Sequence, residues 1–281
     1  MSRSAIVVGT DGSATATIAV DKAGELGQAL GAPVHVVCVP GAIAADQWPQ
    51  RITAQQIVAD AGDRLRGRGV SVETHLPKDQ GDAALALVGV ADEVQAEVIV
   101  LGNRGMTGIR RLLGSLPNRV SHEARCDVLI VPTQSRSVAE FGGGTIVVGT
   151  DGSSAGMRAV KEAVDLAKAL DGELHVGSTS EPSDSTGAAV ATAVAEAADQ
   201  GVNVSTHSLE GDPADALLEV AEKTNAAIVV VDGQGMHSAD RERFGNVADK
   251  LSHSGSSSVL IVFAGNAGDG DSDAGSPGED V

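Results

Sequence analysis

The residues best suited to chemistry follow two short β-branched runs in the first half of this 281-residue chain. Thr10 and Asp11 come directly after a run that ends at Gly9, and Gly102 closes a second run. Parallel strands place their carboxyl ends at one edge of a sheet, where α/β proteins bind ligands. A carboxylate beside glycines, which let a backbone approach closely, therefore predicts a small-molecule site at that edge.

Cations and further glycines extend this pattern toward a phosphate. Arg104 and Gly105 follow Gly102, and a helical pattern begins near Ser115, directly after Gly114. The unpaired backbone N–H groups at that helix start, together with the Ser115 hydroxyl, would face an anion. Arg104 and two further arginines in the segment supply the cations that a phosphate pairs with. The spacing thus predicts an anion-binding site.

Each of these features also has a purely structural interpretation. A GxxG after a strand is most often a tight turn. The segment TDGS is equally typical of an Asp-capped turn into a first helix. The pair Arg110 and Arg111 is typical of a solvated surface. On the residues alone, both interpretations stay open.

The sequence gives little support for catalysis or metal binding. It contains no GxxxxGK[ST], which argues against a P-loop enzyme, and neither Ser13 nor Ser115 has a base that the sequence assigns to it, which argues against a serine nucleophile. The seven histidines show no HxxxH or HExxH spacing. We therefore assign no catalytic residue and no metal site from the sequence.

Composition excludes several classes of partner. The chain is 42% hydrophobic but only 1% aromatic, and its net charge is -18. Few aromatics and a negative charge argue against nucleic-acid binding. No apolar run approaches the roughly 18 residues that span a membrane. The N-terminus lacks a signal-peptide pattern and the two cysteines, Cys38 and Cys126, form no CxxC, so we expect a reduced, cytoplasmic protein.

An internal duplication defines the organisation. Residues 6–13 (IVVGTDGS) recur without change as residues 146–153, and further matches follow in the same order. We therefore predict one domain over residues 1–133 and a second over 144–264. Residues 265–281 are acidic and nearly free of apolar side chains, which predicts a disordered tail.

Within each copy, β-branched runs alternate with helical patterns, which predicts a five-stranded, doubly wound α/β domain with a parallel, Rossmann-like sheet. The strands predicted in the first copy are residues 5–9, 34–39, 70–75, 98–102 and 128–131. The helices predicted between them are residues 15–30, 53–67, 82–96 and 115–124. The strands predicted in the second copy are residues 146–149, 174–177, 202–207, 227–231 and 259–263.

The segments VVGTDGS and LGNRGMTGIRRLLGSLPNRVSHEARCDVLIVP resemble the universal stress protein family. The resemblance covers both copies and implies a tandem member whose domains have the adenine nucleotide alpha hydrolase-like fold. It also implies ATP binding, with or without Mg²⁺, through a Gly-x2-Gly-x9-Gly-Ser/Thr motif. Here eight residues, not nine, separate Gly105 from Gly114.

Carried over by position, the resemblance assigns a role to each part of the site. Asp11 and the backbone near Val39 would contact adenine, and Gly102 would contact the ribose. The phosphates would lie against the glycines and the serine of the motif. The full set of implied nucleotide-binding residues is Gly9, Thr10, Asp11, Val39, Gly102, Arg104, Gly105, Gly114, Ser115 and Leu116.

The second copy departs from this pattern. Asp232 stands where the first copy has Gly102, and Asn246 stands where it has Ser115. Residues 1–140 carry 13 basic and 15 acidic side chains, against 7 and 23 in residues 141–281. Like charges repel a polyphosphate, so we expect the second site to be degenerate.

The leading prediction is a stress-response regulator that binds ATP in its first domain and signals to an unknown protein partner. It would not be an enzyme, apart from slow, incidental ATP hydrolysis. Two alternatives stay open: a nucleotide-free interaction scaffold, and a cyclic AMP-binding protein, for which a shortened loop matters less. We also expect an intramolecular pseudo-dimer with both fifth strands near its axis and residues 134–144 as a polar linker, and a homodimer stays open as an alternative.

Overall fold

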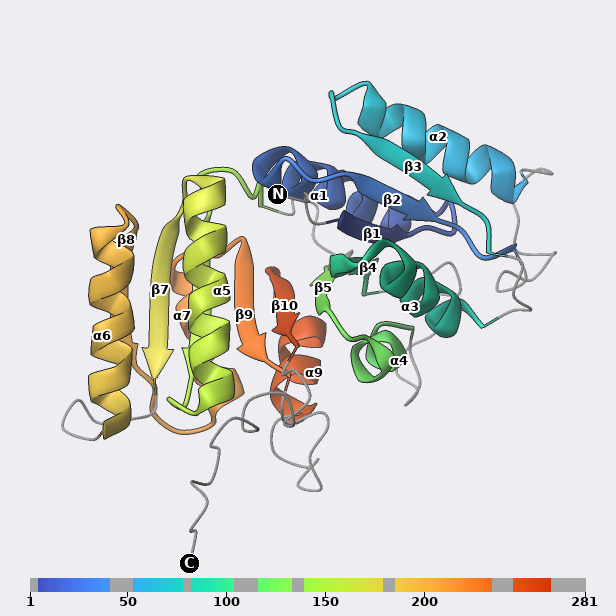
Figure 1. Cartoon of the computed structure of the whole chain (residues 1–281). Helices are drawn as coiled ribbons and strands as arrows, with labels where there is room; N and C mark the ends of the chain where they lie inside the picture. The colour runs from blue at the N-terminus through green and yellow to red at the C-terminus, as the bar shows by residue number, and fades with distance from the viewer. Residues whose placement is uncertain are drawn as a thin grey trace, which may run out of the picture.

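The computed structural model describes residues 5–40, 53–77, 82–103, 116–132, 139–178, 185–233 and 245–263. Its strands form one ten-stranded sheet in the order β3-β2-β1-β4-β5-β10-β9-β6-β7-β8. Each half contributes five strands, all parallel to one another. The doubly wound α/β fold predicted for each copy is confirmed (Figure 1).

The strands are β1 (Ala5–Gly9), β2 (Val34–Val37), β3 (Val72–His75), β4 (Ala96–Gly102), β5 (Asp127–Val131), β6 (Thr145–Thr150), β7 (Glu173–Ser178), β8 (Asn203–Ser208), β9 (Ile228–Asp232) and β10 (Ser258–Val262). The helices are α1 (Ala14–Leu30), α2 (Ala54–Arg66), α3 (Ala83–Val94), α4 (Leu116–Glu123), α5 (Ser154–Leu170), α6 (Ser185–Asp199), α7 (Pro213–Lys223) and α9 (Gly245–Ser254). Every predicted strand is present, although β2 ends two residues earlier than expected and β3 begins two residues later.

Two apolar layers hold the sheet between the helices. Helices α1, α2, α5 and α6 pack on one face, and α3, α4, α7 and α9 pack on the other. Alternate residues of the central strands point to opposite layers, as in Val7 and Val8, which are both fully buried. Strands buried on both faces explain the continuous β-branched runs in the sequence. None of the described helices combines the length and apolar character needed to cross a bilayer.

The two halves join where β5 pairs antiparallel with β10. Leu129 lies opposite Leu260, and these two leucines occupy the same position in the two copies. Val128 faces Ile261 and Ile130 faces Val259, so the ladder has the same register read from either half. A pseudo-twofold axis therefore passes between Leu129 and Leu260, which confirms the predicted position of the fifth strands (Figure 1).

The linker between the copies differs from a polar spacer. Its Phe141 is fully buried in the core layer beside α1. The Phe141 backbone N–H donates to Glu25 Oε2 over 2.9 Å, and Lys22 Nζ lies 4.6 Å from the centre of the Phe141 ring. Lys22 also donates to the Ala139 carbonyl over 2.6 Å. Residues 139–141 are therefore anchored to the first half, whereas the Gly143 N–H donates to the Leu170 carbonyl at the end of α5 in the second half over 2.7 Å. Residues 134–138 and the tail at 265–281 lie outside the described residues.

Candidate functional site

The predicted site lies at the carboxyl ends of β1 and β4. These neighbouring parallel strands mark the point at which the strand order reverses in the first half. The chain leaves β1 into α1 on one face, whereas α4 packs on the other face. We call the region beyond these strand ends the crevice, because α/β proteins whose connections diverge in this way hold their ligands there.

A network of short bonds shapes the turn after β1. The Thr10 backbone N–H donates to the Val37 carbonyl of β2 over 2.9 Å, which continues the sheet by one residue. The Gly12 N–H donates to Thr10 Oγ1 over 3.2 Å. Gly12 has φ +77°, and a Cβ at this position would lie 2.9 Å from the Ile57 side chain. Both constraints explain why glycine follows Asp11.

Asp11 organises the helix start without capping it. Its Oδ1 accepts from the Ser13 backbone N–H over 3.0 Å and from Ser13 Oγ over 2.5 Å. Ser13 Oγ in turn accepts from the Ala16 N–H over 3.1 Å, so Ser13 is the N-cap of α1. The interpretation of TDGS as a turn capped by Asp is therefore wrong about the capping residue, which is Ser13 and not Asp11. The carboxylate of Asp11 is half-buried and fixed in direction.

The end of β2 forms a second wall near Asp11. Val39 is buried with 6% of its surface exposed, and Cys38 is fully buried. Burial, with a contribution from the Asp11 charge, raises the pKa of the Cys38 thiol to about 11. The thiol is thus neutral at physiological pH and presents no nucleophile. This part of the crevice joins an apolar wall to one oriented carboxylate.

The end of β4 forms the other side of the crevice. Gly102 is half-buried, and the next residue, Asn103, donates its backbone N–H to the Val131 carbonyl over 2.9 Å. Asn103 Nδ2 also donates to the Ser252 carbonyl of α9 over 3.2 Å, which joins the first site to the second half. The sequence carries no signal for this contact. Leu116, half-buried, begins α4.

The predicted phosphate-binding segment is not part of the described structure. Arg104, Gly105, Gly114 and Ser115 lie outside the described residues, as do Arg110 and Arg111. The structure thus brings together Gly9, Thr10, Asp11, Val39 and Gly102, with Leu116 at the start of α4. The phosphate contacts stay predictions.

The second half repeats the turn but not its surroundings. The Ser153 N–H donates to Asp151 Oδ1 over 2.9 Å, and Ser153 caps α5. Asp232 closes β9, the strand that corresponds to β4. The second crevice therefore has a carboxylate where the first has Gly102.

An ion pair beside each crevice ties two helices together. Arg119 of α4 lies 2.6 Å from Asp82, the N-cap of α3, and the Arg119 guanidinium lowers the pKa of Asp82. Lys250 of α9 lies 3.2 Å from Asp212, the N-cap of α7. The two pairs occupy corresponding positions in the copies. Arg119 is thus already engaged with a helix start.

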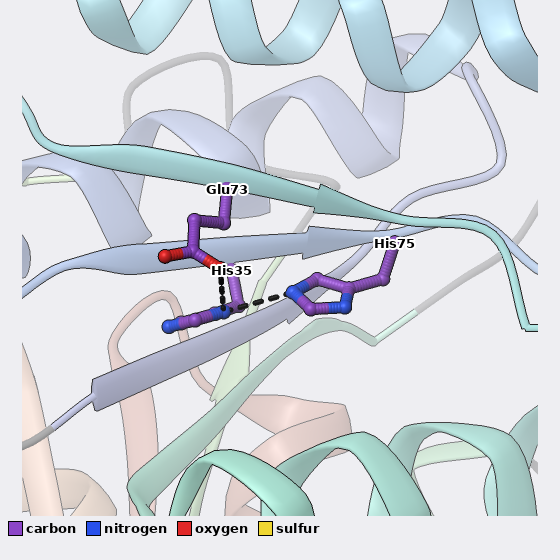
Figure 2. Close-up of side chains that lie close together, drawn as sticks. All are labelled: His35, Glu73 and His75. Atoms are coloured by element: carbon purple, nitrogen blue, oxygen red, sulfur yellow. Dashed lines mark hydrogen bonds and ion pairs between the residues drawn. The ribbon is translucent and has the colours of Figure 1, made fainter.

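Two histidine pairs join neighbouring strands of the sheet, one pair in each half. His35 Nδ1 is 2.8 Å from His75 Nε2, with Glu73 beside them (Figure 2), and His175 Nδ1 is 2.7 Å from His207 Nε2. Burial and the neighbouring ring lower the pKa of His35, and the same causes lower that of His175. These pairs have neither of the helical spacings HxxxH and HExxH, so they were not predicted from the sequence. In strands, the relevant signal is Glu-x-His, because alternate residues share a face.

Comparisons with known proteins match both halves of the chain. A model of the universal stress protein family matches residues 3–132 and 144–262. Universal stress protein Rv1636 of Mycobacterium tuberculosis is 37% identical over 140 residues, which cover 46% of this chain and 95% of that protein. A universal stress protein of Mycolicibacterium smegmatis is 28% identical over 292 residues, covering 92% of this chain and 96% of that protein.

A solved structure shares the fold of the whole described chain. A universal stress protein from Archaeoglobus fulgidus superposes with a TM-score of 0.72 at 20% identity. The match covers 93% of this chain and 97% of that chain. The arrangement of two α/β halves is therefore found in another protein.

Proposed function

The chain belongs to the universal stress protein family, and on that basis we propose that its first half binds ATP in the crevice between β1 and β4. Asp11 is the observation that carries this proposal. Its carboxylate is held by Ser13 at the strand-order reversal, beside the buried end of β2. A fixed acceptor next to an apolar wall suits the exocyclic amine and the flat face of adenine.

The first half is the better of the two sites for a nucleotide. Gly102 presents backbone without a side chain, whereas Asp232 at the same position adds a negative charge. The second half also carries most of the excess acidic residues. Repulsion of a polyphosphate from these carboxylates supports binding in the first half alone.

The role that follows from such a site is regulatory. We propose that occupancy is passed to a protein partner in the cytoplasm, with ATP hydrolysis slow and incidental. Beside Asp11, burial raises the pKa of the Cys38 thiol to about 11, so this thiol is neutral and is not a nucleophile. The contact from Asn103 to Ser252 gives the site a direct connection to the second half.

The test is to titrate the full chain with ATP and to measure binding by calorimetry. Asp11→Ala should weaken binding by about 1–3 kcal/mol, because an adenine donor loses its acceptor. Asp151→Ala is the matched control, since it removes the same turn in the second half. Gly102→Asp should also abolish binding, while Asp232→Gly should not reduce it. Equal effects of Asp11→Ala and Asp151→Ala would contradict the proposal.

Cyclic AMP is a second candidate ligand. The loop between Gly105 and Gly114 is one residue shorter than the family motif, and a single phosphate needs less of that loop. Titration of the same variants with cyclic AMP separates the two nucleotides. Tighter binding of cyclic AMP than of ATP would favour this candidate, and binding of neither would favour a nucleotide-free scaffold.

A further inference from the structure

Three side chains that can bind a metal share one face of the sheet in the first half of the chain. His35 is on β2, whereas Glu73 and His75 are on β3. In the parallel register His35 lies beside Glu73 and Val37 lies beside His75. Since alternate strand residues point to the same side, all three side chains project from the face opposite α1 and α2 (Figure 2).

Their ligand atoms already lie close together. His35 Nδ1 is 2.8 Å from His75 Nε2 and 3.8 Å from Glu73 Oε2. Among the residues that the structure describes, these are the three His, Cys, Asp or Glu side chains with ligand atoms within 4.8 Å of one another. Two nitrogens bound tetrahedrally to zinc at about 2.0–2.1 Å are roughly 3.3 Å apart. A separation of the rings by about half an ångström, within reach of side-chain rotation, would accommodate the ion.

Burial divides the cluster into a fixed part and an accessible part. The His35 side chain is 7% exposed, whereas that of Glu73 is 69% exposed. The partly exposed His75 lies between these extremes. An ion could therefore enter past Glu73 and meet a pre-positioned imidazole.

We propose that His35, Glu73 and His75 bind one Zn²⁺ ion, with water as the fourth ligand. Two imidazoles and one carboxylate form a ligand set that suits zinc, and the three residues span two strands. Bound zinc would fasten the edge strand β3 to β2. None of these three residues is among those predicted to bind the nucleotide, so the zinc proposal does not depend on the proposed function.

The second half provides an internal comparison. Its histidines, His175 and His207, approach to 2.7 Å in the same way. Ser205 lies beside His175 where the first half has Glu73. The nearby Glu173 instead accepts from Asn203 Nδ2 over 3.3 Å. With two imidazoles and no third ligand in place, the second pair should hold zinc more weakly.

A hydrogen-bonded histidine pair without a metal role is the competing interpretation, and zinc titration of the full chain distinguishes the two. The protein is first treated with a chelator and dialysed, and ZnCl₂ is then added in a calorimeter. We expect one tight binding event per chain. Glu73→Gln changes an exposed side chain and should weaken that event at least about tenfold, since even residues behind the ligands affect affinity by this much.

Variants of the histidines complete the test. His75→Gln should abolish the tight event, and His207→Gln, the matched change in the second half, should leave it intact. Circular dichroism checks that each variant is folded, and Co²⁺ in place of zinc should give visible absorption bands that disappear with His75→Gln. The proposal is overturned if the wild-type chain shows no tight event. It is also overturned if Glu73→Gln binds as tightly as wild type, or if His75→Gln and His207→Gln behave alike.

Discussion

Asp127 Oδ1 in the first half accepts a hydrogen bond from the Phe263 backbone N–H in the second half, with 2.8 Å between the two atoms. The pseudo-twofold axis relates Asp127 to Ser258 and Phe263 to Pro132. Proline has no N–H to donate. Ser258 Oγ is accordingly the buried side-chain polar atom that lacks a partner within the described residues. One bond across the interface is thus made on one side of the axis and lost on the other.

Asp127 should make stability depend on pH. Burial, followed by the charges of Glu162 and Glu97, raises the pKa of Asp127 to about 7, while the Phe263 N–H opposes the shift. The pKa of Asp in an unfolded chain is about 3.9. At pH values between these two pKa values, the folded protein therefore holds a proton that the unfolded chain has lost. The contribution of this proton to the free energy of unfolding is complete below the pKa of Asp in the unfolded chain. It is lost as pH rises through the pKa of Asp127 in the folded protein, and the loss reaches about 4 kcal/mol.

The Asp127→Asn variant tests this, because an amide oxygen still accepts from Phe263. Urea unfolding at about pH 5 and about pH 8 should show a smaller loss of stability in the variant than in the wild type. The same slope in both proteins would rule out Asp127 as the titrating group.

Ser258→Ala should stabilise the protein by about 1 kcal/mol, because it removes a buried hydroxyl without a partner. Ser121→Ala is the control, since Ser121 Oγ is buried but donates to the Pro117 carbonyl over 2.9 Å. Urea unfolding should move the two midpoints in opposite directions. Destabilisation by both changes would mean that the Ser258 hydroxyl is satisfied in solution.

Phe141→Ala should destabilise the protein by about 3–5 kcal/mol, the usual cost of emptying a buried aromatic site. The loss includes the ring packed on the almost fully buried Lys22. Phe141→Leu keeps much of the apolar volume and should cost less. Thermal unfolding of both variants measures the difference, and a mild effect of Phe141→Ala would show that the linker is not part of the core.

The first half alone should form a homodimer. Its β5 edge pairs with β10 in a register that is the same from either half, so a second copy can replace the missing partner. The fragment should run to residue 143 to retain Phe141. Analytical ultracentrifugation should find a dimer, and Leu129→Arg, at the axis, should prevent it. A stable monomer of the unchanged fragment would contradict this expectation.

The features of this structure that could be predicted from the sequence were those determined by residues close together in the chain. Continuous β-branched runs marked central strands such as β1 and β6, because strands buried on both faces need apolar residues throughout, whereas the edge strands β3 and β8 are largely exposed. The turn at Asp11 was visible because its residues are adjacent. The histidine pairs were missed because their partners are 40 and 32 residues apart in sequence. Only the register of neighbouring strands brings such residues together.

The linker illustrates a second limit of local patterns. Three glycines after Phe141 suggested a spacer, and nothing in the segment itself indicates where one aromatic ring will pack. Its position depends on Lys22 and Glu25, more than a hundred residues away. The missing partner of Ser258 also could not be predicted from its own segment, because it results from Pro132, which directly follows β5 in the other half.

The antiparallel pairing of β5 and β10 places the strand ends that carry the turns of the two halves on opposite sides of the molecule. Strands within each half run parallel, so the two sets of carboxyl ends open at opposite edges of the shared sheet. The turns at Asp11 and Asp151 therefore face away from each other.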